Sequence, residues 1–133
     1  MDDSVSAGIA KLRRAVGVRA VSRAASAGVR LPVGDTLDTL LPTAIYIALV
    51  SIIDESLEKY LQAKYPEAPH HNLNSRIECM ATRSELINPD RLREIRSRRN
   101  SLAHDSDVFA SWGETEALFL VAEEELGHLD LLK

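Results

Sequence analysis

Three side chains near the end of an arginine-rich segment offer the strongest chemistry in this sequence. Arg99 and Asn100 are adjacent, and His104 follows shortly after them. Arginine carries a permanent cation that suits phosphate, an amide can donate and accept hydrogen bonds, and histidine titrates near neutral pH. Within two turns of a helix, these groups could hold a phosphate and move a proton beside it.

The helix that must position these side chains begins with a clear local signal. The triplet Asn88–Asp90 supplies a capping amide, a first-position proline and a first-turn acid. Further aspartates after His104 indicate that the helix ends near Ala103. Asn100 and His104 are four residues apart and therefore share one face. The histidine then either stabilises the helix end or is free for proton transfer.

Arg99 occupies an unusual position on this helix. At about 100° per residue, it falls on the apolar stripe that Leu92, Ile95 and Leu102 form. A guanidinium on an inner face is costly unless it is paired and hydrogen-bonded. Two interpretations stay open: Arg99 forms a structural ion pair with Asp54 of an earlier helix, or it faces a cleft or subunit boundary and binds phosphate.

The remaining pattern predicts an all-α protein that consists of a single domain over residues 1–133. Helical spacing of apolar residues recurs five times, and no strand alternation persists. The second helix is apolar over most of its surface, which predicts a central position or an interface. Short connections favour a five-helix bundle. The expected helices cover about residues 4–27, 42–64, 73–87, 89–103 and 111–131.

Composition narrows the class of protein. The chain has 133 residues, a net charge of −4 and one cysteine, Cys79, which excludes an internal disulfide and fits a cytoplasmic protein. The acidic N-terminus is unlike a signal peptide, and the apolar run from Ala44 to Ile53 is too short to span a membrane. His70 and His71 lack ligand-spaced thiolates or carboxylates, so we expect solvated loop residues and no metal or cofactor.

The pattern Leu92-x-x-Ile95-x-x-x-Arg99-Asn100-x-Leu102-Ala103-His104 resembles the signature of the HEPN superfamily. That signature is an arginine, commonly followed by a polar residue such as asparagine, and a histidine a few residues later. The family fold is an all-α bundle with the motif before a final long helix, and residues 111–131 match that last helix. The resemblance covers most of the chain in outline.

The resemblance implies a metal-independent endoribonuclease, and many members of the family are toxins or defence-system enzymes that dimerise around a shared cleft. Arg99 would hold the scissile phosphate, His104 would transfer protons, and Asn100 would position one of them. The family's second-helix acid maps best onto Asp54, a supporting residue, with Glu55 as the alternative. RNA contacts are expected from the arginine cluster, namely Arg93, Arg96 and Arg98.

Three functions follow as alternatives. The first is a homodimeric RNase toxin, with an antitoxin protein as a further partner and products that carry 2′,3′-cyclic phosphate and 5′-hydroxyl ends. The second is a non-catalytic HEPN module that binds nucleotide or RNA or serves as a protein scaffold. The third is a helical adaptor or antitoxin without a nucleic-acid role, which the acidic net charge favours.

Overall fold

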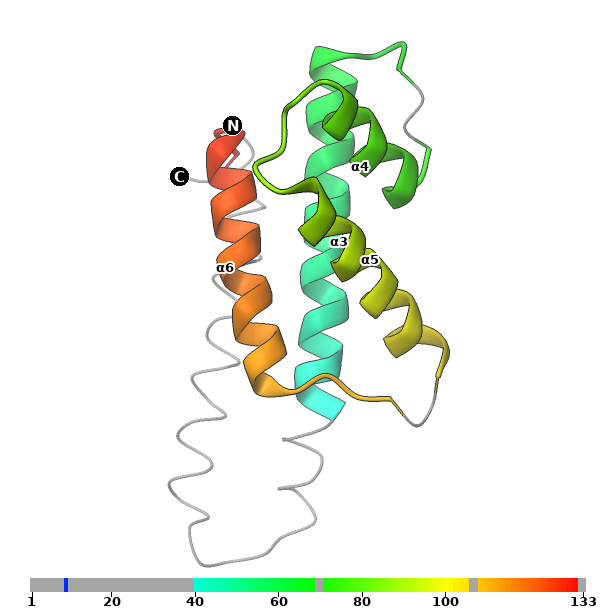
Figure 1. Ribbon diagram of the computed structural model, residues 1–133, viewed down its shortest axis with the longest axis vertical. Helices are drawn as coiled ribbons and strands as arrows, with labels where there is room; N and C mark the ends of the chain where they lie inside the picture. The colour runs from blue at the N-terminus through cyan, green and yellow to red at the C-terminus, as the bar shows by residue number, and fades with distance from the viewer. Residues whose placement is uncertain (1–8, 10–39, 69–70, 106–107, 132–133) are drawn as a thin grey trace, which may run out of the picture.

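The computed structural model describes Ile9 and residues 40–68, 71–105 and 108–131. Over this part of the chain there are α-helices and no strands, which confirms the all-α class (Figure 1). The expected first helix, residues 4–27, lies outside the described residues apart from the helical, buried Ile9. The five-helix count therefore stays a prediction. The helices are α3 (Leu40–Lys64), α4 (Leu73–Thr82), α5 (Pro89–His104) and α6 (Trp112–His128).

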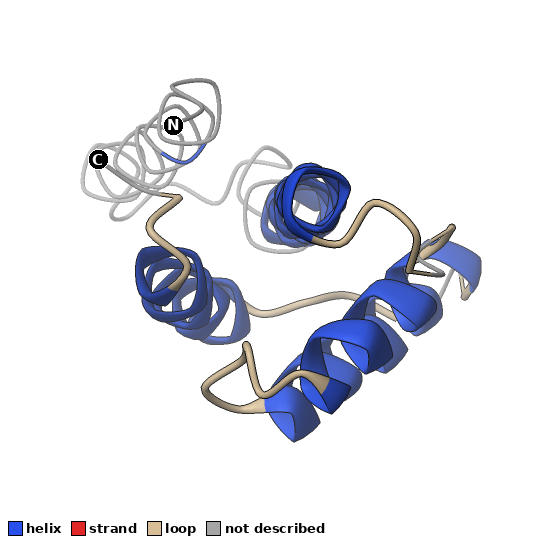
Figure 2. Cartoon of the chain, turned by 90° about the horizontal axis from the view of Figure 1, so that it is seen from above, coloured by secondary structure: helices blue, strands red, loops and turns tan. Residues whose placement is uncertain are grey.

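Helix α3 is the central element of the described bundle, as its broad apolar surface predicted. Each of α4, α5 and α6 contacts α3, with α6 along one side and α4 and α5 along another (Figures 1 and 2). The most deeply buried side chains on α3, Leu49, Leu57 and Leu61, are 0% exposed. These leucines belong to the hydrophobic core that the packed helices share.

By length and composition alone, α3 could cross a membrane. An 18-residue window of this helix reaches a mean hydropathy of 1.6, and 44% of that window is buried inside the bundle. The core helix of a soluble protein passes the same test, and three other helices pack on α3. The absence of a membrane partner stays a prediction.

Helix α4 is shorter than the apolar spacing predicted, since it ends at Thr82 and not near Ile87. Ser84 adopts a left-handed conformation with φ of 55°. Its N–H donates to the Ala81 carbonyl, and the Glu85 N–H donates to the Met80 carbonyl. This pair of hydrogen bonds is a Schellman motif, which stops a helix and is usually built around glycine.

The segment between α4 and α5 is held by two carboxylates. Glu85 accepts hydrogen bonds from the hydroxyls of Tyr60 and Tyr65 at 2.7 and 2.6 Å and lies 2.9 Å from Lys64 Nζ. These donors lower the pKa of Glu85 to about 2. On the other side, Glu125 Oε1 accepts from the backbone N–H of Ile87 at 2.6 Å. The connection is therefore fixed to α3 and to α6 before α5 begins.

Helix α5 begins and ends almost where the sequence predicts. The Asn88 side chain accepts from the Arg91 N–H, Pro89 opens the helix, and the last helical residue is His104. Leu92, Ile95 and Leu102 are buried, as expected from their shared stripe.

The start of α6 is likewise confirmed. Ser111 and Glu114 form a reciprocal capping box. Trp112 and Cys79 are both buried in the core, with 7% of each residue exposed.

Candidate functional site

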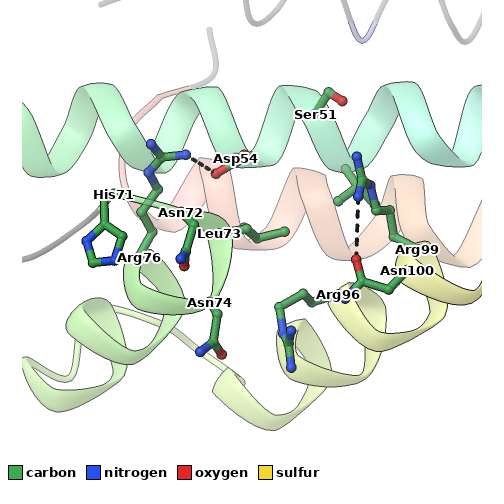
Figure 3. Close-up of a pocket in the computed structure, with 11 residues that line it drawn as sticks. Ser51, Asp54, His71, Asn72, Leu73, Asn74, Arg76, Arg96, Arg99 and Asn100 are labelled. Atoms are coloured by element: carbon green, nitrogen blue, oxygen red, sulfur yellow. Dashed lines mark hydrogen bonds and ion pairs between the residues drawn. The ribbon is translucent and has the colours of Figure 1, made fainter. Parts of the chain in front are cut away.

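Arg99 and Asn100 open onto a cleft of about 610 Å³ between α3, α4 and α5 (Figure 3). Its wall is rich in polar groups, and α5 contributes the cationic part. The lining residues are Val50, Ser51 and Asp54 from α3, His71, Asn72, Leu73, Asn74 and Arg76 at the start of α4, and Arg96, Arg99 and Asn100 from α5.

The guanidinium of Arg99 is half-buried between α5 and α3, consistent with its place on the inner stripe of α5. Its Nη1 donates a hydrogen bond of 3.4 Å to Oδ1 of Asn100. Within residues 40–68, 71–105 and 108–131, no carboxylate lies within ion-pair distance of Arg99. Of the two sequence interpretations, the cleft position agrees with this geometry, and the structural ion pair does not.

Asp54, the predicted ion-pair partner of Arg99, is bound by a different arginine. Its Oδ1 accepts a short hydrogen bond from Arg76 Nη1, and Arg76 Nη2 also lies 3.6 Å from Glu58 Oε2. The physical reason is that α4 packs along α3 and places Arg76 over Asp54, with 11% of the arginine side chain exposed. Asp54 does line the cleft, whereas the alternative, Glu55, is exposed and does not.

The three arginines expected to contact RNA occupy different surroundings. Arg96 lines the cleft, and its buried Nε makes no hydrogen bond in the described structure. Arg93 donates to both carboxylate oxygens of Glu78 at 2.7 and 2.8 Å, and Arg98 does the same to Glu114 at 2.9 and 3.0 Å. Arg93 and Arg98 therefore already hold neighbouring helices together, and Arg96 alone of the three lines the same cleft as Arg99.

The ion pair between Arg98 and Glu114 also affects the titration of the carboxylate. The hydrogen bonds from Arg98 lower the pKa of Glu114, and desolvation opposes that shift. Arg98 Nη2 further donates to the Phe109 carbonyl at 3.1 Å. This arginine thus anchors the connection between α5 and α6.

His104 is placed apart from the cleft within one chain. It is the last residue of α5, is exposed, and is not among the residues that line the cleft. Asn100, one turn earlier, is half-buried and lies at the cleft. The predicted sharing of a face by Asn100 and His104 therefore does not carry the histidine into the cleft, because α5 extends past the cleft before it ends.

Sequence reasoning missed the part of the cleft that the start of α4 builds. His71 was expected to be a solvated loop residue; it is exposed, but it also lines the cleft. The available signal was local: Asn72 and Ser75 form a capping box that starts α4 directly after His71. What the sequence lacks is a sign that this helix start faces α5.

No group of three or more histidine, cysteine, aspartate or glutamate side chains that could hold a metal ion occurs among the described residues. Comparison of the chain with protein-family models, with curated proteins and with solved structures finds no match.

Proposed function

We propose that the protein is a metal-independent endoribonuclease of the HEPN type, acting as a toxin or defence-system enzyme. The observation that carries the proposal is the cleft on α5, where Arg99 and Arg96 form no ion pair in the described part of the chain and Asn100 accepts a hydrogen bond from Arg99. Two guanidinium groups that form no ion pair and line a concave, polar site are suited to a phosphodiester.

In the proposed reaction, His104 transfers protons and Arg99 stabilises negative charge on the phosphate. A 2′-hydroxyl of the RNA loses its proton to a histidine and attacks the adjacent phosphorus, while the bond from phosphorus to the 5′-oxygen breaks. The leaving oxygen takes a proton, which leaves a 2′,3′-cyclic phosphate, or its hydrolysed form, and a 5′-hydroxyl end. Arg99 stabilises the negative charge that grows on the phosphate in the transition state.

This mechanism requires two copies of the chain. His104 of the same chain does not line the cleft, so the proton-transfer group beside Arg99 would be the His104 of the partner subunit. A two-fold dimer supplies two equivalent composite sites of this kind. A strictly monomeric protein in solution would contradict the proposal.

The decisive experiment measures cleavage of single-stranded RNA in EDTA. We expect the wild type to cleave, and Arg99→Ala and His104→Ala to lose about a hundredfold or more in rate. Arg91→Ala and His128→Ala are matched controls, since both residues are exposed and lie outside the cleft. Cleavage that needs added metal, or normal rates in both Arg99→Ala and His104→Ala, would refute the proposal.

A mixing experiment tests the composite site directly. Co-expression of Arg99→Ala with His104→Ala creates heterodimers in which one site combines an intact Arg99 with an intact His104 from the other chain. Random pairing makes half the molecules heterodimers, so about a quarter of the wild-type activity should return. No recovery in verified heterodimers would exclude the arrangement across two chains.

The second candidate function is a non-catalytic module that binds nucleotide or RNA, or scaffolds a partner protein. The exposed position of His104 outside the cleft favours it, because phosphate binding by Arg96 and Arg99 needs no histidine. This module would bind RNA with loss of affinity in Arg99→Ala, yet cleave nothing. Growth arrest on expression of the wild type, but not of His104→Ala, would favour the toxin and its dependence on an antitoxin protein.

A further inference from the structure

The cleft has two chemically different ends. On the α5 side, Arg96 and Arg99 form no ion pair within the described residues, although the charge of Arg96 also acts on Glu78 at longer range, and Asn100 Oδ1 accepts from Arg99. On the other side, Arg76 is balanced by Asp54 and Glu58. Positive charge in excess of its partners is therefore concentrated at the α5 end. A phosphate would sit there, and whatever is attached to the phosphate would extend toward the start of α4.

The start of α4 presents an imidazole and amide side chains that suit a nucleobase. His71, Asn72 and Asn74 line this end of the cleft (Figure 3). The Oδ1 atom of Asn72 is engaged by the Ser75 N–H at 2.8 Å, so this amide is committed to the helix cap. The exposed side chain of Asn74 makes no recorded hydrogen bond within the described residues, and its amide can both donate and accept.

The dimensions agree with a ligand of this kind. The volume of about 610 Å³ lies within the usual range for sites that hold a small molecule or one unit of a polymer. Proteins that read single-stranded RNA stack bases on aromatic or histidine side chains and hydrogen-bond the base edges. The cleft contains one group for each task beside its phosphate-binding arginines.

We propose that the start of α4 is the base-recognition subsite of an RNA-binding cleft, where His71 stacks on a base and Asn74 hydrogen-bonds its edge, while Arg96 and Arg99 hold the neighbouring phosphate. This inference rests on the proposed function only in taking RNA as the ligand. It does not require cleavage, since none of these four residues is assigned to proton transfer. His71 and Asn74 are specificity-determining residues in this assignment.

The test is a binding experiment in the His104→Ala background, so that no RNA is consumed. Fluorescence anisotropy with labelled homotetranucleotides of adenine, cytosine, guanine and uracil gives four affinities for each variant. His71→Ala should weaken binding of the preferred base by roughly tenfold, and His71→Tyr should restore it because the tyrosine ring also stacks. Asn74→Ala should reduce the spread among the four affinities.

Two further variants separate base recognition from charge. Asn74→Asp replaces the amide by an acceptor-only group, so it should shift preference toward guanine, whose Watson–Crick edge offers two N–H donors. Arg96→Ala should weaken all four oligonucleotides by a similar factor and reduce the slope of affinity against salt by about 1. Gln62→Ala and His128→Ala, both at exposed positions outside the cleft, serve as controls.

The outcomes are distinguishable. Unchanged affinities and unchanged spread in His71→Ala and Asn74→Ala, together with weaker binding in Arg96→Ala, would overturn the subsite and leave a phosphate-binding cleft only. Failure of the wild-type cleft to bind any of the four would also overturn it. If these variants lose base-dependent binding and the wild type cleaves no RNA, the nuclease proposal is refuted and the base-recognition subsite is supported.

Discussion

Four of the five arginines of α5 fall into two groups with opposite surroundings. Arg93 and Arg98 each donate two hydrogen bonds to one carboxylate, on α4 and α6 respectively. Arg96 and Arg99 face the cleft without a carboxylate partner in the described residues. Paired guanidinium groups hold helices in place, whereas unpaired ones in a concave site keep their charge available to an anion. One helix therefore contributes both to the frame and to the candidate site.

The largest expected effect is the loss of RNA cleavage when Arg99, one of the cleft arginines, is replaced. Arg99→Ala should lower RNA cleavage by about a hundredfold or more. Thermal stability should change little, because among the described residues Arg99 hydrogen-bonds only its neighbour Asn100, at 3.4 Å. Arg98→Ala should instead lower thermal stability and leave RNA cleavage nearly unchanged. Loss of its partly exposed pair with Glu114 and of the bond to the Phe109 carbonyl should cost about 1 kcal/mol.

The measurements are RNA cleavage in EDTA and thermal unfolding followed by circular dichroism. Arg91→Ala, on the same helix and exposed, controls for removal of positive charge from α5. Equal losses of activity and stability in both variants would show that the two groups do not have separate roles.

The second prediction concerns the carboxylate that fixes the start of α5. Glu125 is 3% exposed, its Oε1 accepts from the N–H groups of Ile87 and Asn88, and its buried Oε2 has no hydrogen-bond partner among the described residues. Glu125→Ala leaves two backbone donors without this acceptor and should cost about 2 kcal/mol. Glu125→Gln keeps an acceptor and removes the free-energy cost of burying an ionised carboxylate. Its stability at pH 7 should therefore equal or exceed that of the wild type.

Urea unfolding of both variants at pH 7 provides the check. Burial raises the pKa of Glu125 in the folded protein. The destabilising effect of its charge is therefore absent in acid and grows as pH rises above the pKa that this carboxyl group has in the unfolded chain. The advantage of Glu125→Gln over the wild type should therefore be larger at pH 7 than at pH 4. A Gln variant as unstable as the Ala variant would show that the ionised carboxylate itself is required.

The third prediction concerns Glu85, whose pKa is shifted in the opposite direction to that of Glu125. Hydrogen bonds from Tyr65, Tyr60 and Lys64 lower the pKa of this carboxylate to about 2. A lowered pKa in the folded state stabilises the protein at pH values above the unfolded pKa, and this contribution is lost as pH falls toward 2. The wild type should thus lose more stability between pH 5 and pH 2 than Glu85→Gln does.

Thermal unfolding in acid, compared between the two proteins, measures this difference. Tyr65→Phe removes one of the three donors and should reduce the acid sensitivity in part. Parallel loss of stability in wild type and Glu85→Gln over the whole range would show that other carboxylates govern acid unfolding.

Features that depend on neighbouring residues could be read from the sequence. Asn88 and Pro89 start α5 where predicted, and the box of Ser111 and Glu114 starts α6. The position of Arg99 on the inner stripe likewise followed from helical periodicity. These predictions succeeded because caps and side-chain spacing act within one or two turns.

Features that depend on packing between helices could not be read in this way. The periodicity of α3 does not show which helix covers Asp54, so its pairing with Arg76 in place of Arg99 was missed. The approach of the start of α4 to α5 equally decides that His71 lines the cleft. A single chain also contains no information about which surface of a second copy would bring His104 to Arg99.

The smallest expected effect concerns the end of α4, where the sequence lacks the usual stop signal. Ser84 holds a φ of 55°, a conformation that costs a non-glycine residue strain and that glycine adopts freely. The motif still forms because the Ser84 and Glu85 N–H groups bind helix carbonyls and Glu85 is held by Tyr60 and Tyr65. Ser84→Gly should therefore raise the free energy of unfolding by about 0.5–1 kcal/mol, as measured by urea denaturation.

Ser84→Ala is the matched control and should give no such gain, because alanine retains the Cβ. A glycine variant that is less stable than the wild type would mean that the serine hydroxyl, and not backbone strain, governs this helix end.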